Sequence, residues 1–204
     1  MAHLPVAVRR ELLVDAAVRV LSREGAARAT TRRIADEAGM PVGALHYCFR
    51  DKDELLGAVI ERLTGELLAV GETALSPGAD FAGTLRAGLG ALWELVVSDI
   101  GKQMSLYELT QFALRTPGLE RLAVRQYEGY LAAAATYLRE AAKASGVTIG
   151  PDLDLLARWF ATTIDGVMLL YTVDRDAERA VAVLSAFIDT LAARVTGTQP
   201  VPAA

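Results

Sequence analysis

The stretch IADEAGMPVGALHYCF, residues 34–49, contains two short segments with the apolar spacing of helices, separated by a glycine. Thr30 or Thr31 can cap the first helix, and Gly39 can adopt the left-handed conformation that ends it. Pro41 suits the first turn of the second helix, because the N–H that proline lacks would be unpaired there. The stretch therefore predicts two short helices joined by a sharp turn.

The chain is predicted to be helical on both sides of this unit. Apolar residues recur at helical spacing over residues 13–21, and Asp51 with Glu54 resembles a capping box that opens a long fourth helix, which the tripeptide at 76–78 is expected to end. Further helices are expected at about residues 81–100, 102–114, 119–144, 152–173 and 176–195. No segment has the sustained alternation of a strand. The predicted fold class is all-α, with about nine helices.

The composition is that of a globular protein, with 52% hydrophobic and 23% charged residues. The net charge of −4 gives no general basic surface: ten Lys and Arg stand against nine Asp and Glu in residues 1–65, and eleven against sixteen beyond them. One cysteine cannot form an intrachain disulfide, and the charged start lacks the apolar run of a signal peptide, so a cytoplasmic protein is expected. No membrane span is expected, because the longest apolar stretch, residues 159–173, is too short.

Two helices joined by a tight turn are the geometry of a helix-turn-helix, whose second helix can enter the DNA major groove. The run TTRRIADEAGMPVGALHYCFRDKDELLGAVI, residues 30–60, resembles the N-terminal DNA-binding domain of the TetR family of transcriptional regulators. The matching positions are Thr31, Ile34, Ala35, Glu37, Ala38, Gly39, Gly43, Leu45, Phe49, Lys52, Leu55 and Leu56. The resemblance implies a three-helix DNA-binding domain at 1–50 and a helical effector-binding and dimerisation domain at 51–196, and the tail at 197–204 is expected to be disordered.

The resemblance also implies a set of DNA contacts. The second helix would meet phosphate through Thr31, Arg32 and Arg33, because a helix N-terminus and guanidinium groups both favour anions. Lys52 would hold a flanking phosphate. The third helix would present five residues to the groove: Val42, Gly43, Ala44, His46 and Tyr47.

The third helix has few side chains that can hydrogen-bond to base edges. Val42 and Ala44 cannot make the bidentate contacts by which arginine reads guanine. Sequence reading is therefore expected to rest on thymine methyls, on Tyr47, on DNA shape, and on Arg28 or Arg33 reaching inward.

Two residues depart from the family pattern. His46 stands where a tyrosine is usual; a neutral hydrogen-bonding surface residue is expected, with a pH-dependent phosphate contact as the alternative. Cys48 stands where a histidine is frequent; a small buried apolar residue is expected, with a redox-sensing thiol as the alternative.

Members of the TetR family commonly bind a small molecule within their C-terminal helices, where aromatic residues with a few polar partners would line an apolar pocket. For any single aromatic residue, a place in the core is the stronger expectation. The residues expected at the effector site are Trp93, Met104, Tyr107, Glu108, Gln111, Tyr127, Tyr130, Tyr137, Trp159 and Thr163.

The last two helices are expected to form a homodimer interface as an intermolecular four-helix bundle. The helix at 152–173 is apolar on more than one side, and Gly166 would let another backbone approach closely. The final helix adds one apolar face, made of Leu184, Phe187, Ile188, Leu191 and Val195.

No catalytic, metal or cofactor site is indicated. His46 and Cys48 are two apart on a helix and do not face one another, and the acidic run at 174–178 lacks the glycine and spacing of a calcium loop. The sequence predicts a non-enzymatic, dimeric repressor that binds a palindromic operator on double-stranded DNA and is released by a small, largely apolar effector. The alternative is a helical small-molecule binding protein that does not act on DNA.

Overall fold

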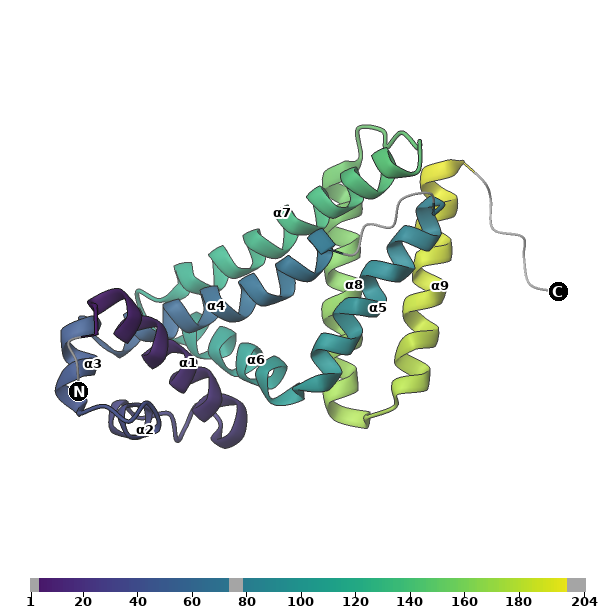
Figure 1. Cartoon of the computed structure of the whole chain (residues 1–204). Helices are drawn as coiled ribbons and strands as arrows, with labels where there is room; N and C mark the ends of the chain where they lie inside the picture. The colour runs from purple at the N-terminus through teal and green to yellow at the C-terminus, as the bar shows by residue number, and fades with distance from the viewer. Residues whose placement is uncertain (1–3, 74–78, 198–204) are drawn as a thin grey trace. The chain divides into compact units, whose positions relative to one another are not determined.

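The computed structural model describes residues 4–73 and 79–197, and within these ranges it contains nine α-helices and no strand (Figure 1). The helices are α1 (Val6–Glu24), α2 (Thr31–Glu37), α3 (Val42–Cys48), α4 (Lys52–Thr73), α5 (Phe81–Ser98), α6 (Ile100–Arg115), α7 (Glu120–Ala144), α8 (Leu153–Asp174) and α9 (Ala177–Thr196). The all-α prediction is confirmed. The predicted helix end at 76–78 lies outside the described residues, as does the predicted tail beyond Gly197.

The turn between α2 and α3 forms as its sequence predicts. Thr30 is the N-cap of α2, and its hydroxyl accepts a hydrogen bond from the backbone N–H of Arg33 at 3.1 Å. Gly39 has φ of 65°, and the N–H of Met40 reaches back to the carbonyl of Ala35 at 2.9 Å. Pro41 is the N-cap of α3 rather than a residue of its first turn. The expected bend is therefore confirmed.

The chain divides into two compact units. One contains Met1–Glu66 and Ser98–Tyr127, and the other contains Leu67–Val97 and Glu128–Ala204. The first unit thus holds α1, α2, α3 and α6 with parts of α4 and α7, and the second holds α5, α8 and α9 with the remaining parts of α4 and α7.

The first unit buries the inner sides of its helices together. Side chains from α1, α2, α3 and α4 are almost fully enclosed, among them Leu13, Leu21, Ile34, Leu45, Leu55 and Val59, together with Phe49 just after α3. Helices as short as α2 and α3 are marginal by themselves in water, so this burial is what keeps them helical.

Helix α6 is fixed against the C-terminal end of α1 within the first unit. The hydroxyl of Ser22 donates to the carboxylate of Asp99 at 2.8 Å, and the same carboxylate caps α6. A Cβ added to Gly101 would overlap the backbone carbonyl of Ser22. The two helices can approach this closely only because residue 101 has no side chain.

The second unit is closed by an antiparallel pair, α8 and α9. Arg175 ends α8 in the left-handed conformation with φ of 58°, and the carboxylate of Asp176 accepts a hydrogen bond from the N–H of Arg179 to start α9. The apolar face of α9 that was expected at a dimer interface is instead mostly packed inside the protomer: Leu184, Phe187, Ile188 and Leu191 are buried. Within the described residues, no helix combines the length and the apolar character needed to cross a membrane.

Candidate functional site

The outer side of α3 carries most of the residues predicted to face DNA. Gly43, His46 and Tyr47 are exposed, and Val42 and Ala44 are half-buried. The inner side is formed by Leu45 and Cys48, both buried. Cys48 therefore occupies the buried position that its small apolar character predicted, and α3 presents one side outward along its two turns.

Arg10, which the sequence did not single out, holds the C-terminal end of α3. Its Nη1 donates to the carbonyl of Cys48 at 2.9 Å and to the carboxylate of Glu54 at 2.9 Å, and its guanidinium lies 4.2 Å from the centre of the Phe49 ring. A cation is stabilising at this end of a helix because the last carbonyls are unpaired there. No local pattern distinguishes Arg10 from the other arginines of α1, so this role could not be predicted from the sequence.

The start of α4 is only half of the expected capping box. The carboxylate of Asp51 accepts a hydrogen bond from the N–H of Glu54 at 2.8 Å, as predicted. The carboxylate of Glu54 does not return to Asp51 but accepts from the backbone N–H of Arg50 at 3.0 Å and from Arg10. These two hydrogen bonds, that from Arg50 foremost, lower the pKa of Glu54 from 4.5 to about 2.

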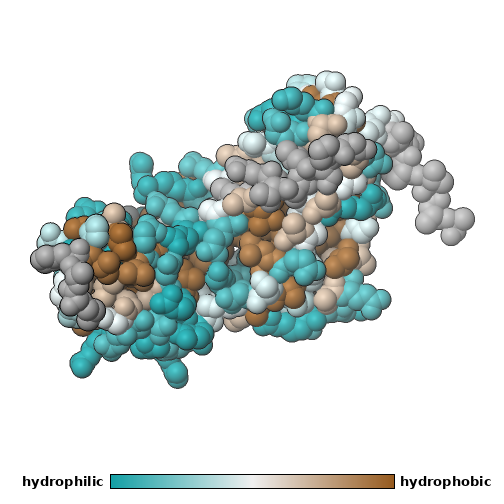
Figure 2. All heavy atoms as spheres, in the orientation of Figure 1, coloured by the Kyte–Doolittle hydropathy of each residue, from teal (hydrophilic) through white to brown (hydrophobic). Residues whose placement is uncertain are grey.

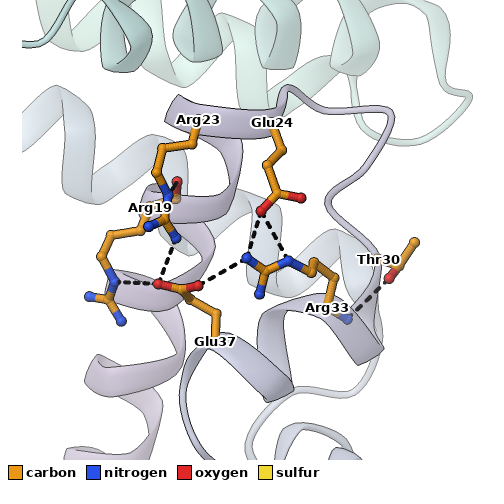
Figure 3. A network of polar contacts seen from close by, with 6 residues as sticks. All are labelled: Arg19, Arg23, Glu24, Thr30, Arg33 and Glu37. Atoms are coloured by element: carbon orange, nitrogen blue, oxygen red, sulfur yellow. Dashed lines mark hydrogen bonds and ion pairs between the residues drawn. The ribbon is translucent and has the colours of Figure 1, made fainter.

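An ion-pair cluster joins α1 to α2 (Figure 3). Arg33 donates to the carboxylate of Glu24 through Nε at 3.0 Å and Nη2 at 2.6 Å, and to Glu37 at 3.1 Å. Glu37 also accepts from Arg19 at 3.0 Å and pairs with Arg23 at 2.7 Å. Hydrogen bonds from Arg19 and then Arg23 lower the pKa of Glu37 from 4.5 to about 2, even though its own burial opposes this shift.

The cations predicted to contact DNA divide into two groups. Arg28, Arg32 and Lys52 have no acidic side chain within ion-pairing distance in the part of the chain that the structure describes, whereas Arg33 is held by two carboxylates. Thr31 is half-buried at the first turn of α2. An unpaired cation can meet a phosphate directly, but Arg33 would first have to leave Glu24 and Glu37.

The ten residues expected at the effector site are split between the two units. Met104, Tyr107, Glu108, Gln111 and Tyr127 belong to the first unit. Trp93, Tyr130, Tyr137, Trp159 and Thr163 belong to the second.

Glu108 has a partner within the first unit. Its carboxylate accepts a hydrogen bond at 2.6 Å from the backbone N–H of Ala26, in the turn that follows α1. This contact adds to those of Ser22 and Gly101, so it ties α6 to the segment that leads into α2.

The aromatic residues of the second unit form a connected series. Trp159 lies edge-on to Phe187 with ring centres 5.2 Å apart, Phe187 lies 5.9 Å from Phe160, and Phe160 lies 6.0 Å from Tyr137. Trp93 makes a separate edge contact with Tyr171 at 4.7 Å. Such ring pairs stabilise the unit beyond the burial of their area. Trp159 and Thr163, four residues apart on α8, keep part of their surface exposed.

Tyr137 belongs to α7, and its side chain is buried in the core of the second unit against α5. Its hydroxyl donates to the carbonyl of Thr84 at 2.6 Å, and burial raises its pKa to about 12. The hydroxyl lies against Gly88, where an added Cβ would overlap it. Glycine at position 88 therefore sets how closely the two helices approach.

The sequence matches two family models in succession. Residues 13–59 match the N-terminal model of the bacterial regulatory proteins of the TetR family, and residues 85–193 match the C-terminal model of the BetI-type transcriptional repressors. The chain belongs to the TetR family of transcriptional regulators. This family consists of DNA-binding regulators and not of enzymes, so the predictions of a helix-turn-helix regulator and of a non-enzymatic protein are confirmed.

Similar proteins cover 81% or more of this TetR-family chain. The nicotine-responsive transcriptional repressor HdnoR of Paenarthrobacter nicotinovorans is 31% identical over 81% of this chain and 84% of its own. The transcriptional regulator BetI of Brucella anthropi is 26% identical over 93% and 95%. The crystal structure of the multidrug binding protein EbrR complexed with imidazole is 29% identical, with a TM-score of 0.62 over 96% of this chain and 97% of that one.

The pKa of Glu37 predicts an acid-sensitive contribution to stability. Because its pKa is about 2 in the folded protein and 4.5 ordinarily, the contribution is complete above pH 4.5 and is lost as the pH falls towards 2. Glu37→Gln should lower the melting temperature at neutral pH. The melting temperature of this variant should also change less than that of the wild type between pH 4.5 and 2. Thermal melting followed by circular dichroism measures both, and Glu61→Gln, at an exposed carboxylate with no ion pair in the described residues, should keep the wild-type profile.

Two glycines on α5 should respond oppositely to alanine. Gly88→Ala forces a methyl group into the Tyr137 hydroxyl and should lower the free energy of unfolding by about 1–3 kcal/mol. Gly90→Ala, two residues away with no atom within 4 Å of the added Cβ, should raise it by up to about 1 kcal/mol through helix propensity. Urea denaturation compares the two variants; equal effects would contradict the close contact at position 88.

Proposed function

We propose that this TetR-family protein is a repressor that binds a palindromic operator as a homodimer and is released by a small, largely apolar effector. The observation that carries operator binding is the outward side of α3, where Gly43, His46 and Tyr47 are exposed, in a unit whose Arg28, Arg32 and Lys52 have no acidic partner among the described residues. Because the outward side of α3 has few hydrogen-bonding groups, it would recognise an operator through contact with thymine methyls and through DNA shape. As a regulator of chromosomal genes, the protein would work in the cytoplasm.

The DNA contacts proposed are those of α2, α3 and the start of α4. Unpaired cations would hold the backbone and the exposed residues of α3 would enter the major groove. The set is Arg28, Thr31, Arg32, Arg33, Val42, Gly43, Ala44, His46, Tyr47 and Lys52. Within it, Arg33 would act mainly by keeping α2 on α1 through Glu24 and Glu37.

The effector proposal rests on the aromatic residues of the helical C-terminal region and on the relatives. One relative is named as nicotine-responsive, and a structural neighbour is a multidrug binding protein complexed with imidazole. The contacts proposed are drawn from Trp93, Met104, Tyr107, Glu108, Gln111, Tyr127, Tyr130, Tyr137, Trp159 and Thr163. The partly exposed Trp159 and Thr163 are the first pair to test. Tyr137 would offer only its ring, since its hydroxyl is engaged by Thr84.

The dimer proposal rests on an apolar stripe along the outward side of α8. Leu155, Leu169, Leu170 and Val173 are all at least half exposed, and an added Cβ at Gly166 would meet nothing within 4 Å. These residues recur at helical spacing on one side of the helix. Figure 2 shows one face of the molecule, on which hydrophobic residues of the second unit gather in patches among hydrophilic ones. A second copy would cover the stripe and bring two α3 helices to the spacing of about 34 Å that successive major grooves require.

Operator binding is tested by selecting bound fragments from sheared genomic DNA with the purified protein. We expect a small set of fragments that share a palindrome and bind with a Kd of about 10⁻⁸ M or tighter at physiological salt, weakening steeply as salt is added. A protein that binds nicotine or imidazole but enriches no fragment would overturn operator binding and support a small-molecule binding protein. An effector that binds while operator affinity is unchanged would contradict release by that compound.

Leu170→Glu should separate the dimer without unfolding the protomer. Leu170 is 57% exposed, so a charge there costs little in the protomer but would be buried against a partner. We expect a monomer in analytical ultracentrifugation, an unchanged circular dichroism spectrum and a loss of operator affinity. Val124→Glu, at a position that is 49% exposed on α7, should remain dimeric. If Leu170→Glu remains dimeric, the dimer interface does not include this side of α8.

A further inference from the structure

The cations of the first 65 residues are mostly neutralised by neighbouring acids. Of the ten Lys and Arg in this region, six make ion pairs within the described residues: Arg10, Arg19, Arg23, Arg33, Arg50 and Arg62. The four that make none are Arg9, Arg28, Arg32 and Lys52. Arg32 and Lys52 were predicted to bind phosphate and Arg28 to reach into the groove, whereas no DNA contact was predicted for Arg9.

Arg9 lies against the recognition helix. It belongs to the first turn of α1, and its guanidinium carbon is 5.0 Å from the centre of the Tyr47 ring on α3. Tyr47 is 68% exposed and belongs to the outward side of α3. The charge of Arg9 is thus held at the surface that α3 presents, although the residue comes from another helix.

The environment of Arg9 lacks an anion. Its side chain is half-buried, and its Nε is enclosed with no hydrogen-bond partner in the described residues. The Tyr47 ring offers a cation–π contact, which only partly replaces the lost hydration of a guanidinium. A phosphate beside the terminal nitrogens would supply the missing counter-charge in the planar geometry that guanidinium groups favour.

We propose that Arg9, stacked on Tyr47, is a DNA backbone contact that flanks the groove entered by α3. This inference rests on the proposed operator binding and adds a contact from α1 to it. Its neighbour Arg10 already donates hydrogen bonds to Cys48 and Glu54. The two adjacent arginines therefore have different roles: Arg10 positions α3, and Arg9 binds the phosphate beside it. The ring of Tyr47 keeps the guanidinium in place before DNA arrives, which reduces the entropy lost on binding.

The test uses a duplex that the wild-type full-length protein selects from a random-sequence pool. Arg9→Met removes the charge while keeping a long side chain. It should weaken binding about tenfold and reduce the slope of log affinity against log salt by about 0.9 for each bound protomer. The preferred sequence should not change, because a phosphate contact carries no base information.

Two further variants separate charge from packing. Arg9→Lys keeps the charge and should keep the wild-type salt slope while losing part of the affinity, since lysine lacks the planar stacking group. Arg62→Met removes a cation that is paired with Glu11 and Asp15 and should leave the slope unchanged. Melting curves check that each variant is folded.

The outcomes distinguish the two proposals. If the wild type selects no duplex, operator binding fails and the role of Arg9 falls with it. If the wild type binds DNA but the salt slope of Arg9→Met equals that of the wild type, only the Arg9 contact is overturned. The same holds if Arg9→Lys reduces the salt slope as much as Arg9→Met does. A preference altered at a single base pair would also overturn it, because Arg9 would then read a base.

Discussion

The carboxylate of Glu37 anchors α2, the helix that leads into the outward-facing α3. Arg19 and Arg23 reach it from α1 and Arg33 reaches it from α2, so a single group joins the two helices. Helix α2 is too short to be stable alone, and α3 follows it through a tight turn at Gly39. The direction in which α3 points therefore depends on contacts made one helix earlier as well as on Arg10, which holds its C-terminal end.

The architecture could be predicted from the sequence because its signals are local. Apolar spacing, the cap at Thr30 and the left-handed Gly39 each act within a few residues, and all three are present in the structure. The pairing of charges could not be predicted in the same way. Arg33 is nine residues from Glu24 and in another helix, so whether it is free or paired depends on how α1 and α2 pack. From the sequence, Arg32 and Arg33 are equivalent; in the structure only Arg33 is bound to acids.

The effector region shows a second limit of sequence reasoning. Aromatic residues at helical spacing can line a pocket or fill a core, and the pattern is the same for both. Tyr137 is buried with its hydroxyl paired, whereas Trp159 on α8 keeps part of its surface exposed. Glu108 is a predicted polar partner for a ligand, but its carboxylate accepts a hydrogen bond from the backbone N–H of Ala26. Only tertiary contacts separate these cases.

The neutralisation of most arginines in the first 65 residues also bears on how the protein is distributed over DNA. Sequence-independent affinity for DNA grows with the number of phosphates that a protein neutralises. Among the described residues of the helix-turn-helix region, only Arg9, Arg28, Arg32 and Lys52 are without an ion pair. The sequence-independent affinity of this region for DNA is therefore expected to be low. Fewer molecules would then be held on the vast excess of unrelated sites, so a modest number of copies could keep one operator occupied.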